Sequence, residues 1–236
     1  MDRFLSEQRL LVIAPHADDE VIGCGGLMAK MKDLGGEVFV QVLTVADLDH
    51  YDGQEGATTA AYTRADELAA AMDCLGVDDF EILIDDPEWH LRLDKMPRRD
   101  LVNLFEREAR LAIDKIKPTI VALPAPSFNQ DHEAVFYAGL TACRPHLATL
   151  KPFQQLVLIA DSPQLAWNDK AFKPNLYVDI TKYLNKKLEA FSKHESQQRP
   201  DPHMGGIEAL RSLAEWRGRE ISVQAAEAYD CMRLVM

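Results

Sequence analysis

The feature that most constrains the fold of this 236-residue chain is the alternation of short apolar runs with stretches of helical periodicity. The runs are rich in Val, Ile and Leu and are nearly continuous, which is typical of strands buried on both faces in a parallel sheet. The helical stretches between them would supply the crossover connections that parallel strands require. The predicted strands are Arg9–Ala14, Val38–Val45, Phe80–Ile84, Thr119–Leu123, Gln155–Ala160 and Leu176–Ile180.

The segments between these runs have apolar residues at helical spacing. Gly35 and Gly76 stand where a left-handed C-cap is expected. The pattern predicts an α/β fold with one doubly wound, Rossmann-like, mostly parallel sheet flanked by helices. We expect a single domain over residues 1–236, in which the segment from about residue 194 onward completes the pocket. The predicted helices are Gly25–Leu34, a segment that begins at Thr58 or Thr59 and ends at Leu75, Arg98–Ile116, His132–Cys143, and a helix capped by Thr181.

Charge and composition exclude several classes of partner. The chain has 38 acidic and 26 basic residues, a formal net charge of −12, which argues against nucleic acid and anionic membranes as partners. No apolar run approaches the roughly 20 residues of a membrane span, so membrane insertion is not expected. The N-terminus lacks the apolar core of a secretory signal, and the four cysteines are scattered singly. We therefore expect a cytoplasmic protein with reduced thiols. Its partner would be a small molecule, and a homo-oligomer is possible.

The predicted topology also predicts where a ligand binds. In doubly wound sheets the strand order is typically 3-2-1-4-5, and ligands bind where the winding reverses, beyond the carboxyl ends of the first and fourth strands. In this chain those ends lead into the loops that begin at Ala14 and Pro124. Most of the unusual polar residues of the sequence lie in these two loops.

The loop after the first strand carries one histidine and three carboxylates, at His16, Asp18, Asp19 and Glu20. Crowded carboxylates repel one another and are costly to desolvate, so such a cluster usually needs a cation. His16 and Asp19 are close enough in sequence to share one Zn²⁺ ion, which would leave Asp18 beside the metal. The alternative is a solvated acidic turn in which Asp18 or Asp19 caps the next helix.

The loop after the fourth strand ends at His132, at the start of a predicted helix. His132 would complete a metal site with His16 and Asp19. Two imidazoles and one carboxylate leave the ion a good Lewis acid with a free position for water. We expect one Zn²⁺ per chain, and Fe²⁺ or another divalent metal would also suit these ligands. Asp131 either orients a ligating histidine or caps the helix.

The stretch Gly23–Gly26 raises a rival hypothesis. Together with Asp47 after the second strand, it loosely resembles a dinucleotide-binding unit. However, a charged segment separates these glycines from the strand, and its carboxylates would repel a pyrophosphate. The glycines are better explained by close packing of the helix against the sheet.

Five short motifs follow one another along the chain. They are Pro15–Glu20 (PHADDE), Arg64–Glu67 (RADE), Asn129–His132 (NQDH), Val178–Thr181 (VDIT) with Lys187 and His194–Gln197 (HESQ), and Arg217-Gly218 with Ala226–Tyr229 (AEAY). In this order they resemble the motifs of the PIG-L (LmbE-like) family of zinc-dependent N-acetylglucosaminyl de-N-acetylases. The resemblance covers nearly the whole chain.

The resemblance implies a hydrolase that removes the N-acetyl group from an N-acetylglucosamine-type amino sugar or its conjugate. It implies His16, Asp19 and His132 as zinc ligands and Asp18 as the general base. Asn129 stands where many members carry the first histidine of HPDH, which is thought to stabilise the oxyanion. The Asn129 amide can still donate a neutral hydrogen bond there.

Three further residues are candidate substrate contacts. Asp47 lies in the segment that corresponds to the family's TDGE-like sequence. Arg64 could reach a substrate hydroxyl or phosphate, or form a surface pair with Glu67. His194 could line the pocket or be a helix C-terminal histidine favoured by the helix dipole. The remaining histidines are interpreted as surface or loop residues, at His50, His90, His146 and His203.

Two alternatives to deacetylation remain at the sequence level. One is cleavage of a larger sugar-linked amide, as in thiol-conjugate amidases similar to this family. The other is a catalytically weak sugar-binding member of the fold, for which Asn129 is the supporting residue. A dinucleotide-binding oxidoreductase is a more distant hypothesis.

Overall fold

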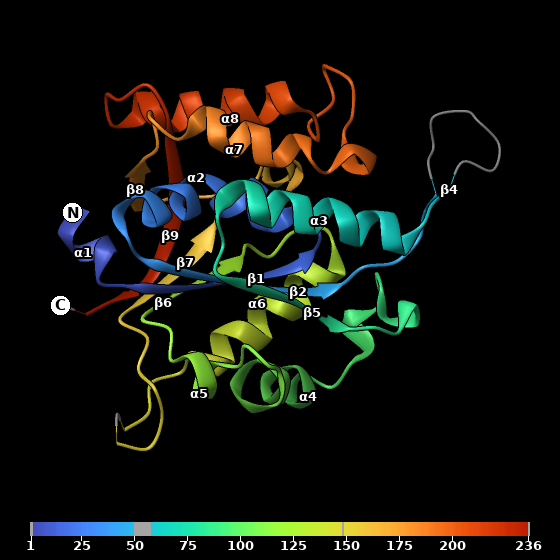
Figure 1. Ribbon diagram of the computed structural model, residues 1–236, viewed down its shortest axis with the longest axis vertical. Coiled ribbons are helices and arrows are strands. Elements are labelled where there is room, and N and C mark those ends of the chain that lie inside the picture. The colour runs from blue at the N-terminus through green and yellow to red at the C-terminus, as the bar shows by residue number, and fades with distance from the viewer. Residues whose placement is uncertain (1, 50–57, 148, 236) are drawn as a thin grey trace.

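The computed structural model describes residues 2–49, 58–147 and 149–235, and a seven-stranded sheet forms its centre (Figure 1). The strands lie in the order β5-β2-β1-β6-β7-β9-β8. The first five are parallel and correspond to the predicted order 3-2-1-4-5, so the predicted fold class is confirmed. The winding reverses between β1 and β6. These five strands are β1 (Arg9–His16), β2 (Glu37–Thr44), β5 (Asp79–Ile84), β6 (Ile120–Pro124) and β7 (Leu156–Ala160).

Strand β9 (Ala226–Leu234) was not predicted from the sequence. It runs antiparallel to both of its neighbours, β7 and β8 (Leu176–Asp179). Its buried first half reads Ala-Glu-Ala-Tyr, which is neither β-branched nor uniformly apolar, so residue pattern gave no strand signal. Short strands β3 (Leu48–Asp49) and β4 (Thr58–Thr59) form a separate antiparallel pair.

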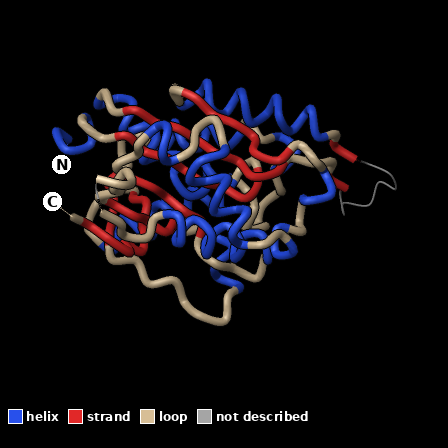
Figure 2. The backbone as a smooth tube through the Cα atoms, turned by 90° about the horizontal axis from the view of Figure 1, so that it is seen from below, coloured by secondary structure: helices blue, strands red, loops and turns tan. Residues whose placement is uncertain are grey.

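Helices cover both faces of the sheet (Figure 1). One face carries α1 (Asp2–Ser6), α2 (Asp19–Leu34) and α3 (Ala61–Leu75), and α7 (Leu184–Ser192) and α8 (Ile207–Glu220) form an outer layer above them. The other face carries α4 (Arg98–Asn103), α5 (Ile113–Ile116) and α6 (Gln130–Ala142). Figure 2 shows helix α1 and the end of β9 on the same side of the molecule. Short helical turns are η1 (Pro87–Trp89), η2 (Leu93–Lys95), η3 (Leu104–Glu108, π-helical), η4 (Pro163–Trp167) and η5 (Glu195–Gln197).

Each face of the sheet has its own apolar core. Alternate residues of β1 point to opposite faces, so Leu10 and Val12 belong to the core under α2, and Leu11 and Ile13 to the core under α6. All four side chains are at most 3% exposed. None of the helices that the structure describes has the length and apolar character needed to cross a bilayer.

Two predicted helices have other boundaries than the sequence indicated. The helix predicted from Gly25 begins at Asp19, so Asp19 and Glu20 lie in its first turn and not in a loop, and Asp18 is its N-cap residue. The helix predicted over Arg98–Ile116 is interrupted after its π-helical turn. The Glu81 carboxylate accepts hydrogen bonds from the N–H groups of Arg110 and Leu111, at 3.0 and 2.7 Å, and this side-chain contact replaces helical pairing there.

Two predicted helix caps are also wrong. Thr58 and Thr59 form β4, and α3 begins later, where Asp47 accepts the Ala61 N–H at 2.8 Å. Thr181 does not cap α7, which begins at Leu184. Its hydroxyl instead pairs with the backbone of Ala225.

The glycines of α2 serve close packing, as predicted. A Cβ atom at Gly23 would lie 2.8 Å from the Cβ of Ala160 on β7, and one at Gly26 would lie 2.7 Å from Cγ2 of Ile180. Real Cβ atoms essentially never approach other heavy atoms this closely. These residues therefore let α2 lie directly against β7 and the segment after β8.

Replacing Gly26 with Ala is expected to destabilise the protein by about 1–3 kcal/mol, the usual cost of overpacking a core. Helix propensity alone would predict the opposite sign, because Ala is favoured over Gly by about 1 kcal/mol in a helix interior. The free energy of unfolding in urea measures the difference. A variant as stable as the wild type, or more stable, would show that Ile180 yields space and that the packing explanation is wrong.

Candidate metal and catalytic site

Three predicted metal ligands, His16, Asp19 and His132, meet where the winding of the sheet reverses. His16 ends β1, Asp19 begins α2, and His132 lies in the first turn of α6. Oδ2 of Asp19 lies 3.3 Å from Nδ1 of His16 and 3.2 Å from Nε2 of His132. Ligands held about 2.0–2.1 Å from a tetrahedral ion lie about 3.4 Å apart, so these distances suit one shared ion. One ligand atom from each residue lies within 4.8 Å of the others.

Asp131 orients one of these histidines. Its Oδ2 lies 3.0 Å from Nε2 of His16, which leaves Nδ1 of His16 facing Asp19. The fully buried Asp131 carboxylate also accepts the N–H groups of Leu91 and Leu93, at 2.8 and 2.9 Å. Of the two roles considered for Asp131, the structure supports orientation of a histidine, a common arrangement behind metal ligands.

Burial and neighbouring charges shift the pKa values of two of these ligands in opposite directions. Burial lowers the pKa of His16, but hydrogen bonds to Asp131 and Asp19 raise it to about 9. Burial raises the pKa of Asp19, but the charges and hydrogen bonds of His132 and His16 hold it well below its ordinary value. A positive charge is therefore stabilised at this position, which is what a cation site requires.

Asp18 lies next to the ligands with its carboxylate free. The structure records no hydrogen-bond partner for this carboxylate within the described part of the chain, and the residue is half-buried. Burial and the charge of Asp19 raise its pKa to about 7. Its φ of 127° lies in the region that L-residues rarely adopt, a strain of about 1–3 kcal/mol that is often found at active sites.

Glu20 and His194 form a buried pair behind Asp18. One oxygen of the Glu20 carboxylate accepts the Asp18 N–H at 2.9 Å, and the other lies 3.0 Å from Nε2 of His194. Both side chains are fully buried. Burial lowers the pKa of His194, but the charge of Glu20 raises it above the ordinary value. The structure therefore connects His194 to Asp18 and does not expose it on the pocket surface.

Asn129 is the N-cap of α6. Its Oδ1 accepts the Asp131 N–H at 2.9 Å, so Asn129 and not Asp131 caps this helix. Its Nδ2 has no hydrogen-bond partner that the structure records among the residues it describes. The amide is therefore fixed by its oxygen and keeps its N–H groups available, as a donor at this position requires.

Arg64 is not in a surface pair with Glu67. It is 2% exposed, and its Nη1 donates to the carbonyl of Ala46 at 2.6 Å. Glu67 instead accepts from the backbone and hydroxyl of Ser196, at 2.8 and 2.6 Å. Asp47 is exposed and its carboxylate caps α3. Substrate contacts by Arg64 and Asp47 stay predictions.

His90 is the residue at this site that sequence reasoning missed. The sequence interpretation makes it a surface or loop residue without a role at the metal site, but its ring lies edge-on to that of His16, with centroids 4.9 Å apart. Its Nδ1 is 2.9 Å from the hydroxyl of Thr44, at the end of β2. Burial and the charge of His16 lower its pKa to about 4, so the ring is neutral at pH 7. No local motif marked it, because it lies in the irregular segment between β5 and α4.

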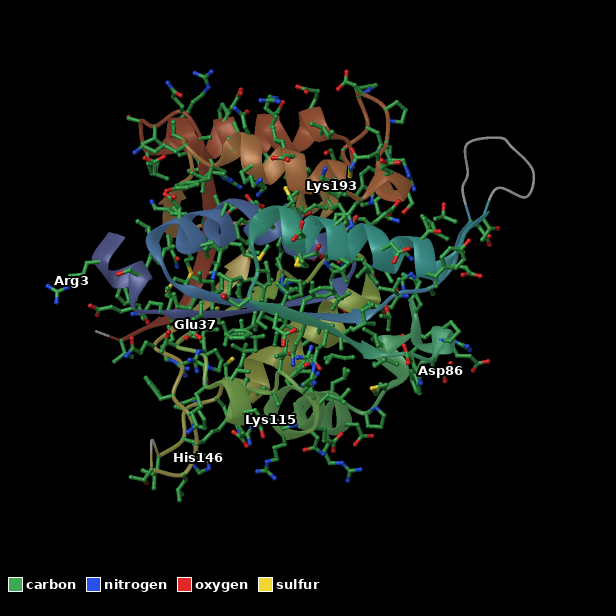
Figure 3. The ribbon with its side chains drawn as sticks, in the orientation of Figure 1. Arg3, Glu37, Asp86, Lys115, His146 and Lys193 are labelled. Atoms are coloured by element: carbon green, nitrogen blue, oxygen red, sulfur yellow. The ribbon has the colours of Figure 1, made fainter. Side chains whose placement is uncertain are left out.

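The other histidines agree with the sequence interpretation where the structure describes them. His146 and His203 are exposed, and Figure 3 shows His146 on a loop that projects away from the sheet. His50 lies outside the described residues.

A small pocket opens against Asp19 and His132. Its wall includes Ser127 from the loop before α6, and Asp161, Ser162 and Gln164 from the segment after β7. The lining thus offers hydroxyl, amide and carboxylate groups that could bind the hydroxyls of a polar ligand.

Comparison with known proteins agrees with this geometry. Residues 11–143 match the family model PIG-L, described as GlcNAc-PI de-N-acetylase. The chain belongs to the PIG-L family. Among curated relatives of this PIG-L protein, the diacetylchitobiose deacetylase of Thermococcus kodakarensis is 29% identical over 232 residues, which cover 95% of this chain and 83% of the relative.

Solved structures share the fold of this PIG-L protein. The conserved protein TT1542 from Thermus thermophilus has a TM-score of 0.73 at 24% identity, over 97% of this chain and 96% of that one. The N,N'-diacetylchitobiose deacetylase from Pyrococcus horikoshii, solved with an inhibitor, has a TM-score of 0.68 at 26% identity, over 95% and 84% of the two chains. The relatives thus match nearly the whole chain.

Proposed function

We propose that this PIG-L protein is a metal-dependent hydrolase that removes the N-acetyl group from an N-acetylglucosamine-type amino sugar or its conjugate. The observation that carries the proposal is the convergence of His16, Asp19 and His132 beside the free carboxylate of Asp18. The Thermococcus and Pyrococcus relatives are named as deacetylases of diacetylchitobiose, which supports an amino-sugar substrate.

The proposed cofactor is one Zn²⁺ ion per chain, held by His16, Asp19 and His132. Two imidazole nitrogens and one carboxylate oxygen suit zinc, and they would also accept Fe²⁺. When bound, the ion would supply Lewis-acid chemistry, polarising the amide carbonyl and making water more acidic. Asp131 would keep the His16 ring in the orientation that this requires.

Asp18 is the proposed general base. Its carboxylate would take a proton from the water that attacks the amide carbon. It would then return that proton to the sugar nitrogen as the C–N bond breaks, so that acetate and a free amine leave the site. The absence of a recorded partner for this carboxylate within the described residues supports a role in which it must gain and release a proton.

Asn129 is the proposed donor to the amide oxygen, which becomes negatively charged as the water attacks. Replacing Asn129 with Asp would keep the oxygen that caps α6 but remove the Nδ2 donor. We expect kcat to fall about 10²-fold, the usual effect of losing one such donor, while the unfolding midpoint stays close to that of the wild type. A folded Asn129→Asp variant with wild-type kcat would exclude this role.

The proposed function is tested by acetate and amine release from a panel of substrates. The panel contains free N-acetylglucosamine, N,N'-diacetylchitobiose, an α-linked N-acetylglucosamine conjugate and a sugar with a longer N-acyl group. We expect stoichiometric acetate and amine from at least one N-acetyl sugar. Cleavage of the longer amide alone would favour the amidase alternative, and binding without release from any member would favour a sugar-binding protein.

A further inference from the structure

The backbone of Asp18 is held on both sides in its unusual conformation. With φ 127° and ψ −33°, this residue adopts a geometry that persists only where its surroundings fix it. Its N–H donates to Glu20, and its carbonyl accepts the N–H groups of Val21 and Ile22, at 3.1 and 2.9 Å. The backbone is therefore anchored while the carboxylate is left free to react.

Glu20 is itself fixed by a residue from a distant part of the chain. Its second carboxylate oxygen meets His194, which closely follows α7 and is 174 positions further along the sequence. Both groups are closed off from solvent, so water does not compete for this contact. Nδ1 of His194 has no hydrogen-bond partner recorded within the described chain. The contact with Glu20 is therefore the polar interaction that accounts for the buried position of the His194 ring.

We propose that Glu20 and His194 are a positioning pair for the base. His194 fixes the Glu20 carboxylate, and Glu20 holds the Asp18 backbone so that the Asp18 carboxylate stays directed at the reacting water. This inference rests on the proposed function, because it requires Asp18 to act as the base. A displacement of about 1 Å at a catalytic group can lower the rate about 10²-fold, so a pair that fixes the position of Asp18 would have a large effect on kcat.

A second buried carboxylate, which lies on β9 and contacts α2, provides a matched comparison. Glu227 pairs with Lys187 at 2.6 Å and accepts the N–H groups of Gly26 and Leu27, both at 2.7 Å. This pair supports the middle of the same helix, and the structure records no contact between it and Asp18 among the described residues. Its loss should lower stability without moving the base.

The experiment compares two disruptive and two conservative variants. Glu20→Leu and His194→Phe remove the contacts, whereas Glu20→Gln keeps an acceptor for the Asp18 N–H and His194→Gln keeps a donor for Glu20. We expect the disruptive variants to lower kcat about 10²-fold with KM changed less than about threefold. The conservative variants should recover kcat to within about fivefold of the wild type. Bound metal should stay near the wild-type level in all four.

Amide hydrogen exchange of Asp18, measured by NMR on the metal-free protein, gives a second readout. Glu20→Leu should speed this exchange about tenfold or more, while Glu20→Gln should leave it slow. Glu227→Gln is the control and should lower the unfolding midpoint while its folded fraction keeps wild-type kcat. If Glu20→Leu does not fold, His194→Phe decides the question.

The outcomes separate the inference from the proposed function. A wild type that deacetylates no substrate contradicts the function, and the Asp18 exchange data still test the pair. An active wild type with unchanged kcat in His194→Phe overturns the positioning pair. The positioning pair is also overturned if Glu227→Gln lowers kcat as much as Glu20→Leu does. The fall in kcat would then come from a general loss of support for α2 and not from movement of Asp18.

Discussion

Replacing Asp18 with Asn is expected to lower kcat for acetate release by about 10²- to 10⁴-fold, the range of a general base, and to leave bound metal unchanged. The amide has the size of the carboxylate but cannot take a proton from water. Asn also tolerates positive φ better than most residues, so the backbone at φ 127° should be retained. The loss of activity should therefore appear in kcat. Elemental analysis should show the same zinc content in this variant as in the wild type.

The matched control is Asp86→Asn. Asp86 is an exposed aspartate that caps η1, and Figure 3 shows it at the periphery of the molecule. Asn is as good a cap as Asp, so we expect wild-type kcat and stability. If Asp18→Asn kept the wild-type rate of acetate release, the base would be another residue.

Replacing His132 with Ala is expected to remove the bound metal and to lower acetate release by about 10³-fold or more, because the Lewis acid would be lost. In the proposed site His132 would supply one of two nitrogen ligands, and its contact with Asp19 would also disappear. The protein should stay folded, because both cores are apolar and a chain of this length buries about 70% of its unfolded surface without a metal. Metal content, kcat and the unfolding midpoint are measured on the same sample.

His146→Ala controls for the loss of any histidine, because His146 is exposed and lies away from the site. It should retain metal and activity. A His132→Ala variant that binds one metal per chain and turns over normally would mean that the ion, if required, is held elsewhere.

The sequence predicted the ligand-binding edge of the sheet because that edge follows from topology. Buried parallel strands are visible as apolar runs, and their order determines which loops meet. His16 and Asp19 lie at the end of β1 and directly after it, His132 follows β6 at the start of α6, and the structure brings the three together. The role of Asp131 was open at the sequence level because a carboxylate at a helix start can cap the helix or reach across the sheet. Asn129 occupies the cap, which leaves Asp131 free to meet His16.

Other parts of the site could not be predicted, because they depend on contacts between distant segments. Glu20 was recognised as part of an acidic cluster, but its contact with His194 depends on how the end of α7 packs on α2. His90 reaches His16 through an irregular loop that has no periodicity. Strand β9 lacks a strand pattern because the charged residue Glu227 interrupts its apolar residues. Glu227 can be buried because it pairs with Lys187, a contact that forms only in the folded chain.

The most direct test of a metal-dependent deacetylase is acetate release by the wild-type protein before chelation, after chelation, and after return of one equivalent of Zn²⁺ per chain. N,N'-diacetylchitobiose is the first substrate to use, since the named relatives act on it. The predicted result is that chelation abolishes acetate release and that one equivalent of zinc restores it, with no recovery in His132→Ala. Full acetate release by protein shown to be free of metal would contradict a metal-dependent mechanism.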